Sequence, residues 1–420
     1  MLALTAEEQR MLDGDAGPAV AMAMRIVTGL GRVVGAERLV EIGSAHIDGC
    51  LHHGQAGVDF AERLVELGGA VAVPTTLNVG SLDLLHPELV RTDAATSSAA
   101  RRLMDAYRAL GAWPTWTCAP YQAGHRPKLG EHVAWAESNA IVFVNSVLGA
   151  RSDRYGDFLD ICAALTGRAP YAGLHLDAHR RGEVVFDLRG LPDAVLGSDL
   201  LYPVLGHLVG ARAQTRVPVI VGLPADAGED DLKALGATAA SSGGVALFHA
   251  VGVTPEAPTL EAALHGGPAE EQHVVTAEDL RGSRAALCTA APGARLDAVS
   301  LGTPHFSVAE FAQLAAALGG GERFAPGVDF YVSTSRDVLA RARANVEACE
   351  AAGVTIVVDT CTYVTPILEP GTRVVATSSG KWAWYAPANL GVDVVLGSID
   401  ECVAWARAGR VGGIGAWPGT

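Results

Sequence analysis

The chain has 420 residues, 49% of them hydrophobic and only 18% charged, and its formal net charge at pH 7 is −15. Such an acidic chain disfavours nucleic acid and anionic membrane as the main partner. The N-terminus lacks the basic-then-apolar pattern of a signal peptide, and no run of about 18 uninterrupted apolar residues predicts a membrane span. We therefore expect a cytoplasmic protein that binds neither nucleic acid nor membrane.

The seven cysteines are far apart in the chain and form no CxxC pair. An odd number of cysteines in a large acidic chain argues against a disulfide framework, and local zinc-knuckle spacing is absent. Any metal held by cysteines must therefore take its ligands from distant segments. Some of the cysteines fall inside predicted amphipathic helices, where we expect ordinary core residues: Cys162, Cys349 and Cys402.

The first predicted element is a helix that begins after Thr5, because Glu8 three residues later completes a capping-box pattern. Further amphipathic helices account for most of the alanine. In "SVAEFAQLAAAL" the large apolar side chains recur at helical spacing and give one packing stripe.

The stretch "EIGSAHIDGCLHHG" (residues 41–54) places three histidines, an aspartate, a glutamate and a cysteine close together. By itself this pattern fits a metal site, a proton-transfer site or a polar turn. The histidines lack HExxH spacing, and the adjacent pair at its end indicates a partly exposed turn. Ser44, His46 and Asp48 alternate, so they share one face of an extended segment. That arrangement favours substrate contact over a zinc site.

A second polar concentration occupies residues 113–151. Cys118 lies beside prolines and is expected in a fixed loop. Glu137 precedes an apolar run that Asn145 and Ser146 interrupt. Buried amides and hydroxyls are costly unless they are hydrogen-bonded, so such interruptions mark either a site or a satisfied contact within the core.

The second half of the chain repeats one sequence pattern: a β-branched run, a Gly/Ser/Thr/Pro loop, then an Ala/Leu-rich amphipathic stretch. This alternation predicts an α/β fold with parallel sheets, in which ligands gather at the carboxyl ends of the strands. The segments that follow it are 217–235, 295–318, 353–368, 371–387 and 391–409.

Two of these segments carry polar residues just after their predicted strands. Cys361 in "VDTCTYVTP" is placed where a thiolate faces a cleft, although an ordinary buried cysteine is the alternative. Ser378, Ser379 and Lys381 in "ATSSGKWAWYAPANLG" precede a predicted helix, whose amides and lysine suit an anion. The GxxxxGK spacing of a P-loop is missing, so a substrate carboxylate fits better than a nucleotide phosphate.

Six blocks stand in a fixed order along the chain: "SAHIDGC", "VPTTLN" (73–78), "CAPYQAGHRPKLGEHVAWAESNAIVFVNSVLGAR", "GTPHFS" (302–307), "VDTCTYVTP" and "SSGKWAWYAP". In this order they resemble the aconitase X family, from about residue 40 to the C-terminus. The resemblance implies aconitase-like multi-layer α/β domains with parallel sheets around a central cleft. It also implies a hydro-lyase with an iron–sulfur or iron centre that removes water from a small hydroxy acid. Family members dehydrate cis-3-hydroxy-L-proline or mevalonate 5-phosphate.

The resemblance also assigns metal ligands. Cys118 and Cys361 match the cysteine ligands of the family, whereas Thr303 stands where many relatives have a further cysteine. Cys50 is the replacement that we expect, a trade that resembles the hydroxyproline branch. It favours a [2Fe-2S] cluster, with a [4Fe-4S] cluster or mononuclear iron as alternatives.

The remaining site residues follow from the matching blocks and from the patterns above. The residues expected to act in proton transfer or charge stabilisation are His46, Asp48, Glu137 and Lys381. The residues expected to contact the substrate are Ser44, Thr76, Asn78, Tyr121, Asn145, Ser146, Ser378 and Ser379.

Enzymes of the aconitase type need a small swivelling domain, and none is evident in this chain. We therefore expect residues 1–420 to be the catalytic large subunit and the swivel domain to be a separate small subunit. The leading hypothesis is dehydration of cis-3-hydroxy-L-proline to Δ1-pyrroline-2-carboxylate. Mevalonate 5-phosphate or another small hydroxy acid is the alternative substrate, and a non-catalytic iron-binding or regulatory scaffold is the alternative class. The sequence leaves open the cluster nuclearity, the proton-abstracting group and the higher oligomeric state.

Overall fold

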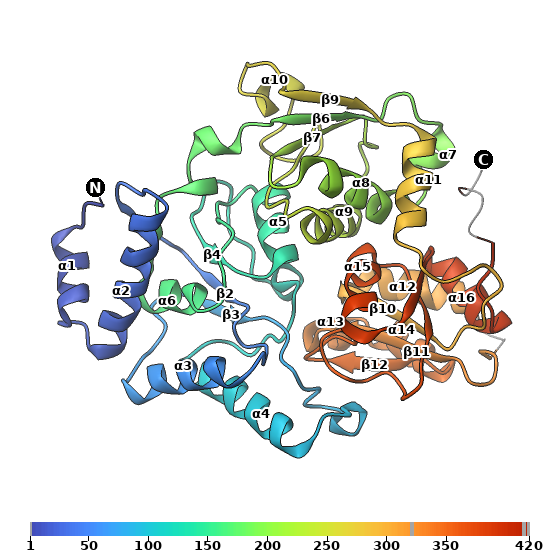
Figure 1. The fold of residues 1–420 in the computed structure, drawn as a ribbon, viewed down its shortest axis with the longest axis horizontal. Helices are drawn as coiled ribbons and strands as arrows, with labels where there is room; N and C mark the ends of the chain where they lie inside the picture. The colour runs from blue at the N-terminus through green and yellow to red at the C-terminus, as the bar shows by residue number, and fades with distance from the viewer. Residues whose placement is uncertain (1, 320–322, 414–416, 418–420) are drawn as a thin grey trace. The chain divides into compact units, whose positions relative to one another are not determined.

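The computed structural model describes residues 2–319, 323–413 and 417. The chain forms two compact units (Figure 1). Unit 1 comprises Met1–Leu82 and Thr92–Arg181, and unit 2 comprises Asp83–Arg91 and Gly182–Thr420.

Unit 1 combines helices with short strands. Its elements are α1 (Ala6–Asp13), α2 (Pro18–Val33), β1 (Leu39–Glu41), β2 (Ala45–Ile47), α3 (Gln55–Glu66), β3 (Thr75–Leu77), α4 (Ala94–Ala109), η2 (Pro120–Ala123), β4 (Ala134–Trp135), α5 (Ser138–Ser146), α6 (Leu159–Thr166), β5 (Arg168–Pro170), η3 (Gly173–His175) and η4 (Asp177–Arg180). The expected capping box opens α1, where Thr5 and Glu8 bond to each other's backbone amides.

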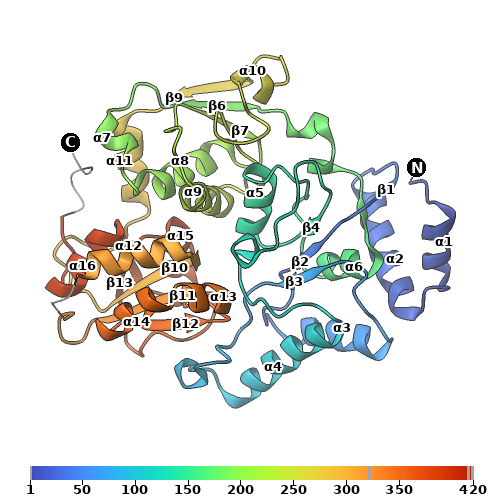
Figure 2. The same ribbon diagram turned by 180° about the vertical axis from the view of Figure 1, so that it is seen from behind.

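The centre of unit 1 is a parallel three-stranded sheet in the order β3-β2-β4, and β1 pairs with β5 in an antiparallel ribbon. Strand β2 is buried along its whole length. In its register, His46 stands opposite Thr76 on one side and Trp135 on the other. Helices α3 and α4 pack side by side below this sheet, as the front and back views show (Figures 1 and 2).

Unit 2 contains the alternating strands and helices that the sequence predicts. Its elements are η1 (Pro87–Leu89), β6 (Val184–Asp187), α7 (Asp193–Leu196), α8 (Leu201–Ala213), β7 (Pro218–Val221), α9 (Glu229–Ser242), β8 (His249–Ala250), α10 (Leu260–Ala263), β9 (Glu271–Val274), α11 (Ala277–Ala286), β10 (Ala298–Phe306), α12 (Val308–Leu318), β11 (Asp329–Thr334), α13 (Arg336–Arg341), α14 (Arg343–Ala351), β12 (Thr355–Val358), β13 (Val374–Thr377), α15 (Gly380–Leu390), β14 (Asp393–Leu396) and α16 (Ile399–Ala408).

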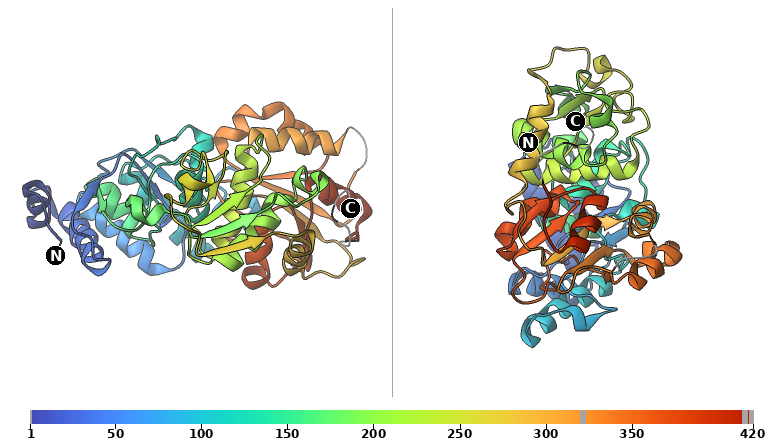
Figure 3. Two further views of the ribbon diagram at one scale, coloured as in Figure 1. Left: turned by 90° about the horizontal axis from the view of Figure 1, so that it is seen from above. Right: turned by 90° about the vertical axis from the view of Figure 1, so that its right-hand side faces the viewer.

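Two parallel sheets organise unit 2. The first has the order β8-β7-β6-β9, and the second has the order β12-β11-β10-β13-β14. Helices cover both faces of the second sheet (Figure 3), as expected for parallel strands joined by right-handed crossovers. Its core packs apolar residues of the strands against α12, α14 and α16, including Phe311, Cys349 and Cys402. The mixed α/β class with parallel sheets is thus confirmed. In the described part of the chain, no helix is long and apolar enough to cross a membrane.

Candidate active site

The polar residues of 41–54 gather around the central strand of unit 1. His46 is fully buried, and its Nδ1 lies 2.8 Å from the Thr76 hydroxyl. Trp135 contacts both His46 and Ser44. Its ring centroid lies 5.7 Å from that of His46, and its indole N–H donates to Ser44 Oγ at 3.3 Å. Burial, and then the neighbouring His125, lower the pKa of His46 to about 3. A neutral ring results, and its Nε2 has no hydrogen-bond partner among the described residues.

Asp48 follows directly after β2 and is partly buried. Its Oδ1 accepts a short hydrogen bond from the side-chain amide of Asn78. Burial chiefly, and then the carboxylates of Glu137 and Asp157, raise its pKa to about 7. A carboxyl group with this pKa gains and loses a proton near neutral pH, which suits a general acid or base.

Cys50 lies at the end of the same loop, with its side chain fully buried. Its Sγ lies within donating distance of the backbone carbonyls of Ile47 and Asn78, at 3.5 Å and 3.3 Å. Burial, and then the charge of Asp48, raise the pKa of this thiol well above its ordinary value. The protonated thiol is therefore the favoured form unless a cation is bound to the sulfur.

Cys118 and Tyr121 are both buried around the short helix η2. Asn139, at the start of α5, holds the two together: its side-chain amide donates to the Cys118 carbonyl at 2.9 Å and to the Tyr121 hydroxyl at 3.0 Å. The Tyr121 ring stacks on Phe143 of the same helix, with 3.5 Å between centroids. Cys118 therefore lies in a fixed loop, as the prolines in its neighbourhood predict.

Glu137 is the N-cap of α5. Its carboxylate accepts from the Ala140 amide at 2.7 Å and from the Ser138 hydroxyl at 3.1 Å. Its backbone has a φ of 73°, a left-handed conformation that is uncommon for a residue with a side chain. Glu137 therefore has a capping role in addition to any chemical one.

Asn145 and Ser146 are buried at the last turn of α5. The Asn145 side chain donates to the Ser152 carbonyl at 2.8 Å and accepts from the Ser152 amide at 3.0 Å. It also accepts from the buried Arg180 guanidinium at 3.1 Å. The side chain of Asn145 is therefore hydrogen-bonded within the core, which is one of the two roles that the sequence left open.

In unit 2, Cys361 and His305 come together where strands β12 and β10 end. A ring nitrogen of His305 and Sγ of Cys361 lie within 4.8 Å of each other, and both residues are buried. The His305 Nε2–H donates to the Thr360 carbonyl at 3.1 Å. Burial is the main cause that lowers the pKa of His305 to about 4. In the neutral ring that results, Nδ1 carries the lone pair, which is the form that binds a metal.

Ser379 is the N-cap of α15. Its Oγ accepts from the Trp382 amide at 3.0 Å and donates to the Thr303 carbonyl, and its own amide donates to Thr377 Oγ1 at 3.1 Å. Lys381 is buried in the first turn of this helix. The prediction of a helix start with a lysine is confirmed. However, the hydroxyl of Ser379 is engaged in capping, so any anion there would meet the amides of the first turn.

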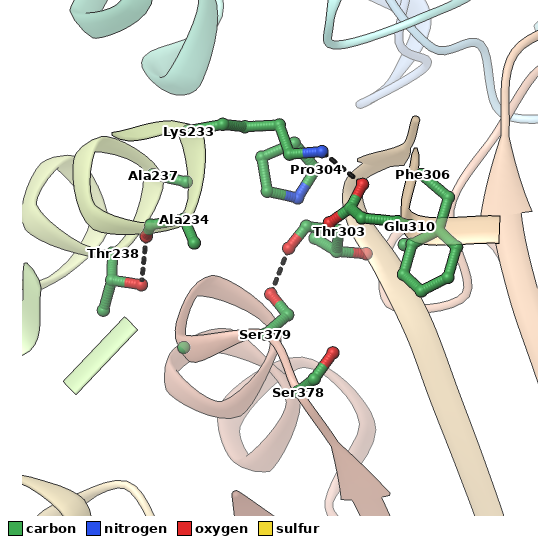
Figure 4. Close-up of a pocket in the computed structure, with 12 residues that line it drawn as sticks. Lys233, Ala234, Ala237, Thr238, Thr303, Pro304, Phe306, Glu310, Ser378 and Ser379 are labelled. Atoms are coloured by element: carbon green, nitrogen blue, oxygen red, sulfur yellow. Dashed lines mark hydrogen bonds and ion pairs between the residues drawn. The ribbon is translucent and has the colours of Figure 1, made fainter. Parts of the chain in front are cut away.

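A cavity of about 30 Å³ lies beside this helix start (Figure 4). Such a volume holds one or two water molecules, since one water needs roughly 10–15 Å³. Lys233, which pairs with Glu310, and Thr303 line it together with Ser378. The buried Thr303 hydroxyl has no hydrogen-bond partner among the described residues. The residue that replaces the expected cysteine thus presents an unsatisfied hydroxyl.

The structure brings the predicted residues together as two groups, one in each unit. In unit 1, hydrogen bonds or ring contacts link His46 to Thr76 and Trp135, and Asp48 to Asn78. Sequence reasoning missed His305, although an ionisable residue at the end of a predicted strand and directly before a predicted helix was a usable signal. It also missed Asp160, a carboxylate inside the apolar run "FLDICAAL" whose backbone contacts no local pattern foretells.

These geometries define an α/β protein whose parallel strands present thiol, imidazole and carboxyl groups at their ends. Three family models describe successive parts of the chain: the aconitase X first domain matches residues 1–178, the second domain 182–285 and the third domain 296–408. The chain belongs to the aconitase X family.

Individual relatives agree. The chain is 43% identical to a cis-3-hydroxy-L-proline dehydratase of Pseudomonas aeruginosa, with 99% of this chain and 72% of the relative covered. It is 38% identical to a phosphomevalonate dehydratase large subunit of Methanothermobacter thermautotrophicus, covering 92% of this chain and 94% of that subunit. The crystal structure of the holo-form of Thermococcus kodakaraensis aconitase X matches with a TM-score of 0.86 at 34% identity, covering 96% of this chain and 100% of that one. The chain is therefore a hydro-lyase.

Dehydratases of the aconitase superfamily typically use an iron–sulfur cluster, and the side chains of this structure fit such a group. Thiolates are the usual ligands of iron–sulfur clusters, and imidazole replaces them in some. In unit 2, the sulfur of Cys361 and a ring nitrogen of the neutral His305 lie within 4.8 Å. In unit 1, the thiols of Cys50 and Cys118 are buried.

Proposed function

We propose that the chain dehydrates cis-3-hydroxy-L-proline to Δ1-pyrroline-2-carboxylate. The observation that carries this proposal is the 43% and 40% identity to two relatives named cis-3-hydroxy-L-proline dehydratase, from P. aeruginosa and Hypocrea jecorina. The reaction removes the α-proton and the 3-hydroxyl group as water. The enamine that remains then tautomerises to the imine.

The residues of unit 1 would serve proton transfer. The α-proton of an amino acid is weakly acidic, so its removal needs a positioned base and stabilisation of the developing charge. Asp48 has a carboxyl group oriented by Asn78, and His46 has a neutral ring with Nε2 unengaged among the described residues. Thr76 fixes that ring through a hydrogen bond with His46 Nδ1, and Ser44 fixes the indole of Trp135, which lies beside the ring. We assign Asp48 and His46 to proton transfer, and Glu137 to support through its charge.

The residues of unit 2 would hold the substrate carboxylate. Backbone amides at a helix N-terminus, together with an ammonium group, stabilise an anion. Lys381 and the first turn of α15 supply both features, with Ser378 and Ser379 beside them. In unit 1, Asn78, Tyr121 and Ser146 are the further residues proposed to face the substrate, whereas Asn145 is assigned to support of the site.

For the cofactor we propose a [2Fe-2S] cluster with Cys50, Cys118 and Cys361 as ligands, and with His305 next to Cys361 as a further donor. When bound, the iron supplies Lewis acidity to the departing hydroxyl group. Cys50 fits this role through its environment: burial, and then the charges of Asp48 and Asp160, disfavour a free thiolate, so a thiolate there needs a cation. A [4Fe-4S] cluster or a single iron would be distinguished by electron paramagnetic resonance.

We also propose that residues 1–420 act as a large subunit with a separate small swivel subunit. Support comes from the phosphomevalonate dehydratase relatives, which are named large subunits and of which this chain covers 94% to 98%. The two hydroxyproline dehydratase relatives are longer, since the chain covers 72% and 68% of them.

The test is an anaerobic preparation of the chain with its candidate small subunit, assayed on both substrates while the visible spectrum is recorded. Turnover of cis-3-hydroxy-L-proline supports the proposal. Turnover of mevalonate 5-phosphate alone would transfer the chain to the second candidate function, which five large-subunit relatives favour. No turnover of either compound by an iron-loaded sample would contradict both.

A further inference from the structure

Asp160 is a fully buried carboxylate near the start of α6, a helix whose other residues are apolar except Thr166 at its end. Its Oδ2 accepts from the backbone amide of Asp48 at 2.7 Å and from that of Gly49 at 3.2 Å. Its Oδ1 accepts from its neighbour Ile161 at 2.7 Å. More than 110 residues of chain separate this side chain from the loop that it holds.

The loop that Asp160 holds links Asp48 to Cys50 just beyond β2. It is confined on its other sides as well. A Cβ atom on Gly49 would lie 2.8 Å from the Tyr107 hydroxyl, so only glycine fits without a shift. The Cys50 thiol faces the carbonyl of Asn78 at 3.3 Å. Two backbone amides of the loop therefore point to Asp160, and the Cys50 thiol points to Asn78, at the end of the neighbouring strand β3.

A carboxylate at this buried position does not benefit the stability of the fold. Burial raises the pKa of Asp160 to about 6 although three backbone amides donate to it. A buried carboxylate costs free energy that a neutral acceptor would avoid. Its gain is geometric, because a single rigid group takes two consecutive backbone amides of one loop.

We propose that Asp160 is a positioning residue, which fixes the loop so that Asp48 and Cys50 are held in working orientation. It touches neither substrate nor iron, and it acts through the backbone of the loop, as outer residues of metal sites commonly do. The inference rests on the proposed function in one respect, since Asp48 and Cys50 take their roles from it.

The test compares Asp160→Asn and Asp160→Ala with Asp157→Asn in the iron-loaded full chain. Asp157 is an exposed carboxylate whose charge also acts on Asp48, but it makes no hydrogen bond to the loop among the interactions of the described residues. Hydrogen exchange of the Asp48 and Gly49 amides reports the positioning directly and needs no substrate. The control amide is that of Asn78, which donates to the Ile47 carbonyl at 2.9 Å.

In Asp160→Asn, whose amide oxygen keeps one acceptor, we expect the two loop amides to exchange at least about 10-fold faster, with Asn78 unchanged. Iron per chain and kcat should fall about 10-fold, while KM changes less than about twofold. Asp160→Ala should show larger effects, and Asp157→Asn should keep the wild-type exchange rates of the two loop amides and the wild-type iron content.

The proposal is overturned if the loop amides exchange at the wild-type rate. It is also overturned if Asn78 and the rest of unit 1 accelerate equally, since that outcome indicates a merely structural role. Equal losses in Asp160→Asn and Asp157→Asn would assign the effect to charge and overturn it too. If the wild type turns over neither substrate, the proposed function fails, whereas the exchange and iron measurements still decide the role of Asp160.

Discussion

The two groups of site residues differ in how their charge is arranged. Around β2 in unit 1 the ionisable groups are mostly carboxyls, and burial together with repulsion from neighbouring carboxylates raises the pKa of Asp48 and Asp160. At the strand ends of unit 2 stand a neutral imidazole, His305, and a lysine, Lys381. The first arrangement suits a group that gains and loses protons. The second suits ligands for a metal and for an anion.

The two regions also differ in how the backbone supports them. In unit 2 the functional residues lie at the ends of strands in a five-stranded parallel sheet, whose hydrogen-bond ladder fixes where each strand ends. In unit 1 the strand β2 has three residues, and a side chain from another helix fixes the loop after it. Substitutions in unit 1 should therefore affect function through distant contacts more readily than those in unit 2.

The largest expected effect is that of Cys361→Ser. A hydroxyl is a poor ligand for cluster iron, so the visible absorbance and the activity should fall to the detection limit. The matched control is Cys349→Ser, because Cys349 is a residue of α14 that is buried in the apolar core of unit 2. Iron analysis and the absorbance spectrum of both variants check the prediction. If the Cys361→Ser enzyme stays coloured and active, Cys361 is not a ligand of the cofactor.

Asp48→Asn should come next. Without a carboxyl group to transfer protons, kcat should fall by about 100-fold or more, as is typical for general acid–base catalysis. Iron content should stay near the wild-type value, which separates this variant from those of the ligands. Asp59→Asn, on the exposed face of α3, is the control and should retain activity. A wild-type kcat in Asp48→Asn would contradict the assignment of proton transfer to the residues of unit 1.

Lys381→Ala should have an effect of intermediate size. Loss of an ammonium group that holds a carboxylate should raise KM about 10-fold or more, with a smaller change in kcat. Lys128→Ala removes an exposed lysine of unit 1 and is the control. Steady-state kinetics on the carboxylate substrate measure both variants. A change confined to kcat would indicate that Lys381 takes part in the chemical step instead.

The smallest effect concerns stability against pH. Burial lowers the pKa of His46 to about 3 in the folded protein, below its ordinary value of 6.5. The unfolded chain then binds the extra proton between these values, so stability is complete above about pH 6.5 and declines as the pH falls toward 3. The contribution of one such group is about 1.4 kcal/mol per pH unit. In His46→Gln the free energy of unfolding should decline less steeply over this range, as chemical denaturation would measure. His179→Gln, at an exposed histidine, should keep the wild-type slope.

Much of unit 2 could be predicted from sequence, because its signals are local. β-Branched runs followed by Gly/Ser/Thr/Pro loops predicted the strand ends and helix starts, and in the structure Ser379 and Ser398 of two such loops cap α15 and α16. The position of Cys361 after β12 followed from the same pattern. The pairing of Cys361 with His305 did not, because it depends on the order of the strands in the sheet, where β11 lies between β12 and β10.

In unit 1 the polar stretch 41–54 was evident, but its internal order was not. The predicted alternation places Ser44 and His46 against one residue, Trp135, which only the pairing of β2 with β4 brings there. Asp160 could not be recognised at all. Its partners are backbone amides, which carry no sequence signal.

Local signals in the sequence predicted the first helix, the α/β alternation of unit 2 and the residue types available for chemistry, since hydrophobic period, capping and turn residues act over a few positions. The tertiary structure decided which of those residues meet and in which protonation state they do so. Burial and neighbouring charges set the pKa values of His46, Asp48 and His305, and both depend on contacts between segments far apart in the chain.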